Sequence, residues 1–430
     1  MPTNPPISRE FTKALGPYVG NFLSSSLLAV LFARWMGVDH YGAFAFAYHI
    51  LRLVALLAGL GFNLAAVRFI PLYGQNDSAG LVRGFLRVGL LANLLFGLLL
   101  GFAVLSALLP FLEGSHSYHV LKHLWWVAPL LGINFYFSGV MRSYGLASWA
   151  AASRGFMRDL IAVFFAFFIT SGTRAISPDM AFILFAYAIS LCALIQTVSL
   201  VRLIPKKLRR APPRYDLKKW LGSSLPMLGS SVAEISVATV GILIIRLVID
   251  EKAVALYHVA WVVSTLALIP TQALVAVVGR HLSRLSSVSG KGFERLLKTS
   301  LHLQLFTTVS VCLGLVFFSR PLLLLFGPVY GEAQPLLIAL VVAKMFHATV
   351  MLLTRSLALS GHEKSVARSL YVIVSLIITA SAVLAFPLGP MGVAAAYLFF
   401  SLVAFLYYGL ELRRSLGIHL FPLFSKVKKT

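Results

Sequence analysis

The segment that decides the fold of this chain spans residues 202–220 and reads R-L-I-P-K-K-L-R-R-A-P-P-R-Y-D-L-K-K-W. Eight of its residues are Lys or Arg, and Asp216 is its single acidic residue. Its three prolines disfavour a continuous helix. Long apolar segments flank it on both sides, and a basic loop in such a place is typical of the cytoplasmic face of a membrane protein. We therefore interpret residues 204–220 as a cytoplasmic linker between two hydrophobic halves, and not as a nucleic-acid-binding loop.

The composition supports this interpretation. The chain has 430 residues, of which 59% are hydrophobic and 12% charged, with a mean hydropathy of +0.87. A soluble domain carries about 25% charged residues, so most of this chain is expected to lie in a lipid bilayer. The net charge of +23 is explained by Lys and Arg at the cytoplasmic face, and no nucleic-acid partner is expected. Cys192 and Cys312 lie in apolar runs, and no Cys/His spacing indicates a metal or a cofactor.

The apolar runs predict an all-α fold, because each is long enough for a helix that crosses the membrane in about 20 residues. About twelve spans are expected, at residues 15–36, 41–63, 85–109, 121–144, 155–170, 180–203, 221–249, 253–278, 297–318, 333–359, 366–386 and 392–412. They form an N-terminal six-helix lobe (residues 1–203) and a C-terminal six-helix lobe (residues 221–412). A basic cytoplasmic tail follows at residues 413–430.

The segments between these spans alternate between rich and poor in Lys and Arg. Of the 37 Lys and Arg residues, 29 fall in segments that twelve spans place on the cytoplasmic side, and 6 fall on the opposite side. This asymmetry predicts that both termini are cytoplasmic.

Short matches at one constant offset indicate an internal repeat. P-Y-V-G at residues 17–20 matches P-M-L-G at residues 226–229, and Tyr48-His49 matches Tyr257-His258. Six spans per half give the two copies the same orientation in the membrane. Transporters use such parallel repeats, with the substrate site between the halves.

Three ionisable residues lie deep inside predicted spans: Arg52, Glu234 and Lys344. Such a side chain costs about 2.5–3.5 kcal/mol at the bilayer centre, so it usually faces a cavity or a partner. Two cations and one anion leave the interior positive, which favours an anionic substrate over a cationic drug. Glu234 is the candidate for coupling to H⁺ or Na⁺, although a fixed ion pair with one of the cations is an equal alternative.

Other polar residues complete the candidate site. Arg34 and Arg246 lie at span ends, where they could bind substrate or extend to the interface. A polar lining of the cavity is expected from His49, Asn63, Asn134, His258 and His347. Each of these five could instead tie two helices together. We interpret Asp250 and Glu251 as a solvated turn and expect no catalytic residue.

Several segments resemble polysaccharide flippases of the multidrug/oligosaccharidyl-lipid/polysaccharide exporter superfamily. They are L-F-A-R-W-M-G-V-D-H-Y-G-A-F-A-F-A (residues 31–47), A-G-L-G-F-N-L-A-A-V-R-F-I-P-L-Y (residues 58–73), L-L-L-L-F-G-P-V-Y-G-E-A-Q-P-L-L (residues 322–337) and P-L-G-P-M-G-V-A-A-A-Y (residues 387–397). The resemblance covers nearly the whole chain in family order. It implies a two-lobed bundle of twelve helices around a central cavity that opens alternately to each side.

The resemblance also implies a function. Such proteins carry undecaprenyl-diphosphate-linked oligosaccharides from the inner to the outer leaflet for O-antigen, capsule or exopolysaccharide assembly, where polysaccharide polymerase machinery is a partner. By position, Arg34 and Arg52 match the cationic residues used for the diphosphate and sugar acids. The alternatives are a multidrug exporter or peptidoglycan-precursor flippase of the same superfamily, and a membrane-embedded polymerase or ligase. The short outer loops speak against an enzyme, so we expect a transporter that changes no covalent bond.

Overall fold

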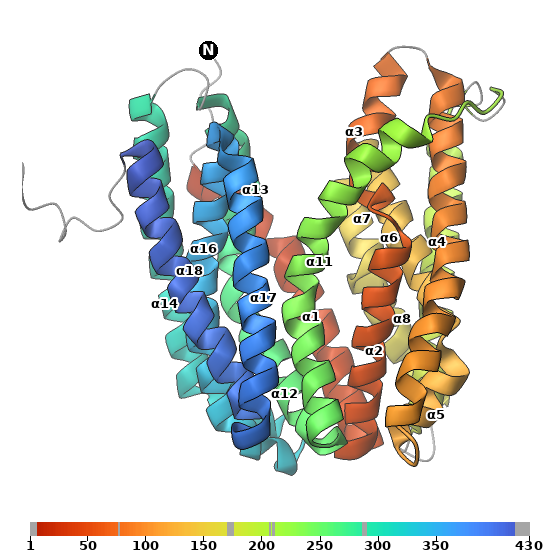
Figure 1. Ribbon diagram of the computed structural model, residues 1–430, viewed down its shortest axis with the longest axis vertical. Helices are drawn as coiled ribbons and strands as arrows, with labels where there is room; N and C mark the ends of the chain where they lie inside the picture. Colours follow the sequence, from red (N-terminus) through yellow and green to blue (C-terminus); the bar gives the residue numbers. More distant parts are fainter. Residues whose placement is uncertain are drawn as a thin grey trace, which may run out of the picture. The chain divides into compact units, whose positions relative to one another are not determined.

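The computed structural model describes residues 7–75, 78–169, 176–205, 208, 211–285 and 290–417, and within them it contains helices and no strand (Figure 1). The chain divides into two compact units. We call Gly20–His258 the N-terminal unit, and Met1–Val19 together with Val259–Thr430 the C-terminal unit. The all-α prediction is confirmed.

In the N-terminal unit, α6 packs against α2, α3, α4 and α9, and α11 packs against α2 and α3. A buried aromatic cluster that includes Phe69, Phe85, Tyr136 and Trp220 holds α3, α4, α6 and α11 together. The helices are α1 (Ile7–Met36, from Gly20 onward), α2 (Val38–Ala58), α3 (Phe62–Gln75), α4 (Ala79–Leu108), α5 (His116–Leu124), α6 (Val127–Ser143), α7 (Ala147–Arg154), α8 (Phe156–Ile169), α9 (Pro178–Leu203), α11 (Leu217–Val248) and the start of α12 (Glu251–Ser264).

The second predicted span is broken where α2 gives way to α3. Leu60 and Gly61 have positive φ angles of 46° and 76°, which interrupt the helix. A Cβ on Gly61 would lie 2.2 Å from the carbonyl oxygen of Ser224 in α11, so this close approach excludes a side chain. Asn63, which the sequence places in the same span as Arg52, therefore belongs to the next helix, α3.

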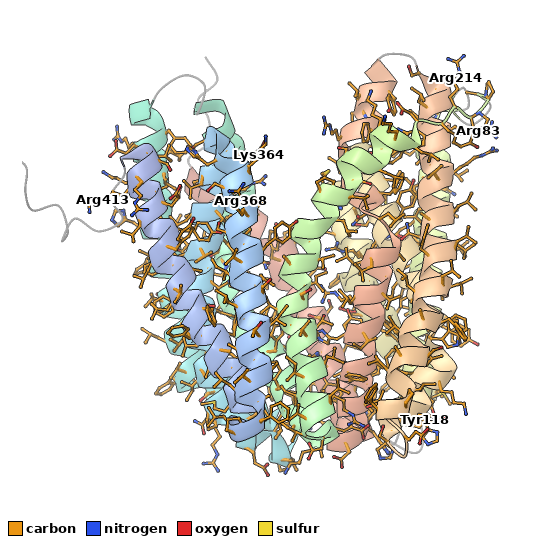
Figure 2. All side chains as sticks on the ribbon, in the orientation of Figure 1. Arg83, Tyr118, Arg214, Lys364, Arg368 and Arg413 are labelled. Atoms are coloured by element: carbon orange, nitrogen blue, oxygen red, sulfur yellow. The ribbon has the colours of Figure 1, made fainter. Side chains whose placement is uncertain are left out.

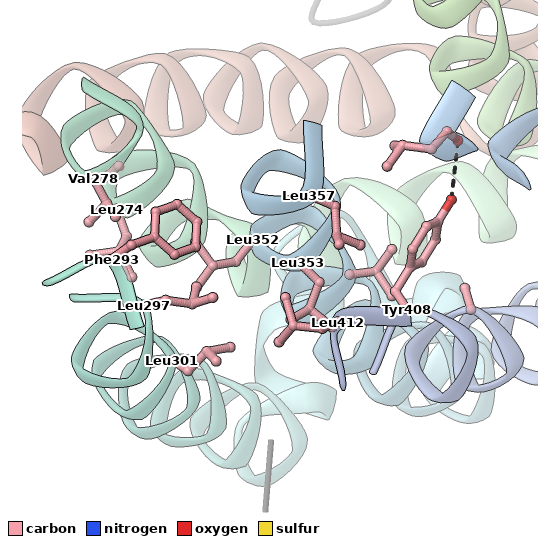
Figure 3. Close-up of a cluster of buried hydrophobic side chains, with 14 of the residues drawn as sticks. Leu274, Val278, Phe293, Leu297, Leu301, Leu352, Leu353, Leu357, Tyr408 and Leu412 are labelled. Atoms are coloured by element: carbon pink, nitrogen blue, oxygen red, sulfur yellow. Dashed lines mark hydrogen bonds between the residues drawn. The ribbon is translucent and has the colours of Figure 1, made fainter. Parts of the chain in front are cut away.

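The C-terminal unit is a bundle in which α18 packs along both α16 and α17. Its core includes Leu274, Phe293, Leu353 and Tyr408. Van der Waals packing of such side chains holds helices together in a membrane, because lipid tails are as apolar as the side chains themselves. Figure 3 shows this core and the bond from the Tyr408 hydroxyl to the Val366 carbonyl, 3.4 Å long. Besides the end of α12, the helices are α13 (Ile269–Leu285), α14 (Gly290–Phe317), α15 (Ser319–Leu324), α16 (Gln334–Leu357), α17 (Glu363–Leu388) and α18 (Pro390–Leu416), with short turns η2 (Thr265–Leu268), η3 (Pro328–Ala333) and η4 (Ala358–His362).

The described helices match the predicted spans closely. Eight are long and apolar enough to cross a membrane, or up to ten if two bent pairs each count as one span. One of the eight, Pro328–Leu388, has 61 residues, which at 1.5 Å per residue is about three times the ~30 Å of the hydrocarbon core. It is bent at η4, so α16 and α17 provide two crossings. The architecture is consistent with about twelve spans.

Within each unit, basic residues that flank predicted cytoplasmic ends gather at one end (Figure 2). Arg83 and Arg214 lie at one end of the N-terminal unit, and Tyr118, from a predicted outer loop, lies at the other. Lys364, Arg368 and Arg413 share one end of the C-terminal unit. The compact units do not coincide with the expected lobes, because the linker, α11 and the start of α12 group with the first half. The six-plus-six lobe division stays a prediction.

Candidate anion-binding site

The first element of the candidate site is α2. Tyr48 and Arg52 lie one helical turn apart, so they share a face of the helix. Arg52 is half-buried, and among the described residues it has no hydrogen bond or ion pair. An arginine in this state keeps all of its donors available for an anion.

The second element is the corner formed by the end of α6, α7 and the start of α8. It supplies Arg142, Arg154 and Arg158. The start of α8 is fixed from α1, because the Phe156 N–H donates to Asn21 Oδ1 at 3.0 Å. This cap satisfies one of the four free N–H groups at the helix start and holds the corner in place.

Four arginines, one each on α2, α6, α7 and α8, interact electrostatically through Arg154. Arg154 lies within electrostatic range of Arg52, Arg142 and Arg158, and we call these four residues the arginine cluster. Arg154 itself is exposed, and its guanidinium lies 5.8 Å from the centre of the Phe135 ring. Like charges repel one another, and a bound anion would relieve that repulsion.

One carboxylate partly offsets the cluster. Arg158 donates from Nε and Nη2 to Asp159 Oδ1 at 2.8 and 2.6 Å. Asp159 is only 1% exposed. Its Oδ2 and the Nε of Arg142 are buried and lack a partner among the described residues. Asp159 lies in the first turn of α8 and is not among the site residues predicted from the sequence.

Lys344 lies in the C-terminal unit and is 1% exposed. Its ammonium donates to the Trp261 carbonyl at 2.9 Å and to the Thr265 hydroxyl, and it sits 4.0 Å from the centre of the Trp261 ring. These contacts hold the break at η2 between α12 and α13. His347, one turn further along α16, has its ring 6.0 Å from that of Tyr397.

Arg246 takes part in a buried network at the junction of α11 and α12. Glu251 Oε1 accepts from the Ser117 N–H at 2.7 Å and from its hydroxyl at 2.6 Å. Arg246 donates to the same hydroxyl at 3.1 Å and lies 3.5 Å from Glu251 Oε1. Glu251 is only 8% exposed, so its interpretation as part of a solvated turn is wrong: it ties α5 to α12.

Three of the predicted lining residues are buried within the N-terminal unit. The rings of His49 and His258 lie 5.3 Å apart, and His258 Nδ1 is 3.1 Å from the Tyr41 hydroxyl. Asn134 donates to Gln196 Oε1 at 3.3 Å. These contacts fit the alternative of ties between helices.

Arg34 and Glu234 are the last two predicted site residues. Arg34 is exposed in the last turn of α1 and has a partner. Glu234 lies on α11, but its side chain is outside the part of the chain that the structure describes.

Sequence reasoning found Arg52 but missed the rest of the arginine cluster. On the sequence alone, Arg142, Arg154 and Arg158 are three of the 29 predicted cytoplasmic charges that set the topology. A usable signal existed, because Arg158 and Asp159 begin an otherwise apolar segment, where an acid next to a base predicts a buried pair.

Solved structures share this architecture across almost the entire chain. An inward-facing multidrug resistance MATE family transporter of the MOP superfamily has a TM-score of 0.72 and 17% identity, covering 97% of this chain and 96% of its own. The lipid II flippase MurJ in an inward closed conformation has a TM-score of 0.70 and 18% identity, covering 94% and 87%. A MOP superfamily transporter from Pyrococcus furiosus, whose binding pocket of reverse polarity suggests a different function, has a TM-score of 0.62 and 17% identity, with 96% of both chains covered.

These similarities define the class: a polytopic helical membrane protein with the fold of MOP superfamily transporters. A comparison with curated protein sequences finds no match. The family is shown by the sequence itself, because the model of the polysaccharide biosynthesis protein family matches residues 17–282. The chain belongs to that family.

Proposed function

We propose that this protein is a flippase that moves an anionic lipid-linked oligosaccharide, such as an undecaprenyl-diphosphate-linked glycan, from the inner to the outer leaflet of a prokaryotic plasma membrane by alternating access. The arginine cluster carries the proposal. Arginine binds phosphate oxygens through paired N–H donors, and of the four arginines only Arg158 is paired with a carboxylate, Asp159, among the described residues. An excess of positive charge of this kind favours a diphosphate.

The family and the fold support the same cargo class. The chain belongs to the polysaccharide biosynthesis protein family, and MurJ, which shares the fold, is a lipid II flippase. The Pyrococcus furiosus transporter indicates that pocket polarity can reverse within this fold. An arginine-lined site accords with an anionic cargo rather than a cationic drug.

We further propose that both termini are cytoplasmic, that Glu234 binds a coupling H⁺ or Na⁺, and that polysaccharide polymerase machinery receives the translocated glycan. Arg34 is a second candidate contact for the sugar acids. We assign Lys344 and Arg246 to holding helices together, because neutral acceptors and Glu251 already engage their donors.

Purified protein in liposomes tests the proposal directly. Wild type should move a lipid-linked oligosaccharide between leaflets without changing the mass of its glycan, which would exclude a polymerase or ligase. Arg52→Ala and Arg142→Ala should each slow translocation by about 10–100-fold, since a hydrogen bond to a charged group contributes about 1.5–3 kcal/mol. Arg52→Lys should retain more activity than Arg52→Ala.

Arg320→Ala is the matched control, because Arg320 is exposed on α15 outside the cluster. Its translocation rate and the melting temperature of every variant should stay at the wild-type value. Export of cationic drugs with no movement of the lipid-linked glycan would overturn the assignment, as would normal translocation by both cluster variants.

A further inference from the structure

The basic linker is fastened to the start of α4. Arg83 donates to the Ala211 carbonyl at 2.7 Å, and the Arg214 N–H donates to the Gly80 carbonyl at 2.8 Å. The contact requires glycine at position 84, because a Cβ there would lie 1.8 Å from the Arg214 carbonyl oxygen. Residues 211–216 are therefore held in a fixed conformation against α4 on the N-terminal unit.

The beginning of α11 is fixed beside this surface. The Asp216 carboxylate caps α11 by accepting from the Lys219 N–H at 3.3 Å. Trp220 is fully buried, and its indole N–H donates to the Tyr73 hydroxyl at 2.9 Å. Arg68 donates to the Ser223 hydroxyl at 3.0 Å. The ends of α3, α4 and α11 thus present their basic side chains from one packed framework.

The charge on this framework is strongly one-sided. We define the basic platform as Arg68, Arg83, Arg87, Arg214, Lys218 and Lys219. All but Arg83 are exposed. Within residues 62–75, 78–90 and 211–223, Asp216 is the single acidic residue, and its carboxylate already caps a helix. Two apolar side chains stand among the cations, with Tyr215 55% and Leu217 49% exposed.

We propose that the basic platform binds the headgroups of anionic phospholipids in the cytoplasmic leaflet, with Tyr215 and Leu217 entering the interface beside them. Figure 2 places Arg83 and Arg214 at the end of helices that cross the membrane, which is the depth of the headgroups. Clustered Lys and Arg next to a span attract anionic lipid, and amphipathic aromatic rings prefer this interface. An acidic protein would leave Leu217 without an apolar environment.

Lipid retention by the purified full chain tests this proposal. Protein in a neutral detergent would be incubated with phosphatidylglycerol and phosphatidylethanolamine of identical acyl chains, and bound lipid counted by native mass spectrometry. Wild type should retain phosphatidylglycerol over phosphatidylethanolamine, and the preference should shrink as NaCl rises. Arg87→Gln/Lys218→Gln should weaken phosphatidylglycerol binding roughly 30-fold, or about fivefold per charge removed.

Two comparisons separate this effect from loss of folding or of net charge. Arg87→Lys/Lys218→Arg keeps the charge and should keep the lipid preference. Lys122→Gln/Arg320→Gln removes two exposed charges elsewhere and should leave it unchanged. The proposal fails if wild type holds both lipids equally, or if Arg87→Gln/Lys218→Gln and this control behave alike. Binding of an acidic peptide without any lipid preference would assign the platform to a protein partner and overturn it.

Discussion

The ammonium group of Lys344 lies 4.0 Å from the centre of the Trp261 ring and donates a hydrogen bond of 2.9 Å to the carbonyl of the same residue. That carbonyl also accepts from the hydroxyls of Ser264 and Thr265, at 2.9 and 2.8 Å. The three donors together satisfy a carbonyl at the break η2. A cation predicted to face substrate thus stabilises a helix break in the C-terminal unit.

Lys344→Met should be tolerated. Loss of the charged hydrogen bonds and the ring contact lowers the free energy of unfolding by about 2–4 kcal/mol. The variant also no longer buries a cation, and removal of that desolvation penalty raises it by several kcal/mol. The carbonyl of Trp261 keeps its two hydroxyl donors. We expect unfolding free energy within about 1 kcal/mol of wild type, measured by thermal denaturation, and near-normal translocation. A stable Met variant that no longer translocates would show instead that Lys344 contacts the substrate.

Asp159→Asn should tighten anion binding. The substitution keeps an oxygen acceptor for Arg158 but removes the negative charge that pairs with it. We expect roughly tenfold tighter binding of pyrophosphate at low salt, equal to about 1.4 kcal/mol, by isothermal titration calorimetry. The variant should also lose about 1–3 kcal/mol of stability, because a charge-assisted bond becomes a neutral one. Glu363→Gln, an exposed site in the C-terminal unit, should change neither quantity. Weaker pyrophosphate binding by Asp159→Asn would contradict an anion site here.

Gly84→Ala should release the linker from α4. Its Cβ would overlap the carbonyl of Arg214, and such overpacking typically costs about 1–3 kcal/mol. Faster trypsin cleavage within residues 211–216 would report the release. Gly222→Ala is the opposite case on α11, where nothing lies within 4 Å of the added carbon. That variant should gain up to about 1 kcal/mol from helix propensity. Equal melting temperatures for the two variants would refute the tight contact.

Glu234→Gln tests the coupling hypothesis from the sequence. A carboxyl on a membrane-spanning helix changes its proton affinity when its access to water or to a cation changes. Imposed pH or Na⁺ gradients should accelerate translocation by wild type in proteoliposomes. They should have no effect on Glu234→Gln, which should still bind the lipid-linked substrate. If the variant responds to gradients as wild type does, Glu234 is not the coupling site.

The fold was largely predictable because transfer from water to lipid is a local property. Each run of about 20 apolar residues favours a span whatever its neighbours are. Local hydropathy does not predict the break after Gly59, because that break is not a local property. It depends on the approach of the Gly61 backbone to Ser224, which lies 163 residues further along the chain. Glu251 was missed because its burial depends on Ser117 and Arg246.

The amino-acid sequence alone determined that this is a basic, polytopic helical membrane protein with about twelve spans, and it singled out Arg52. These conclusions depend on hydropathy and charge, which act residue by residue. Only the tertiary structure decided which charges meet. It brought Arg52, Arg142 and Arg158 within electrostatic range of Arg154, paired Arg158 with Asp159, and assigned Lys344 to a helix break. The physical reason is that a charged group buried among helices takes its role from its neighbours, and helix packing, not sequence spacing, brings those neighbours together.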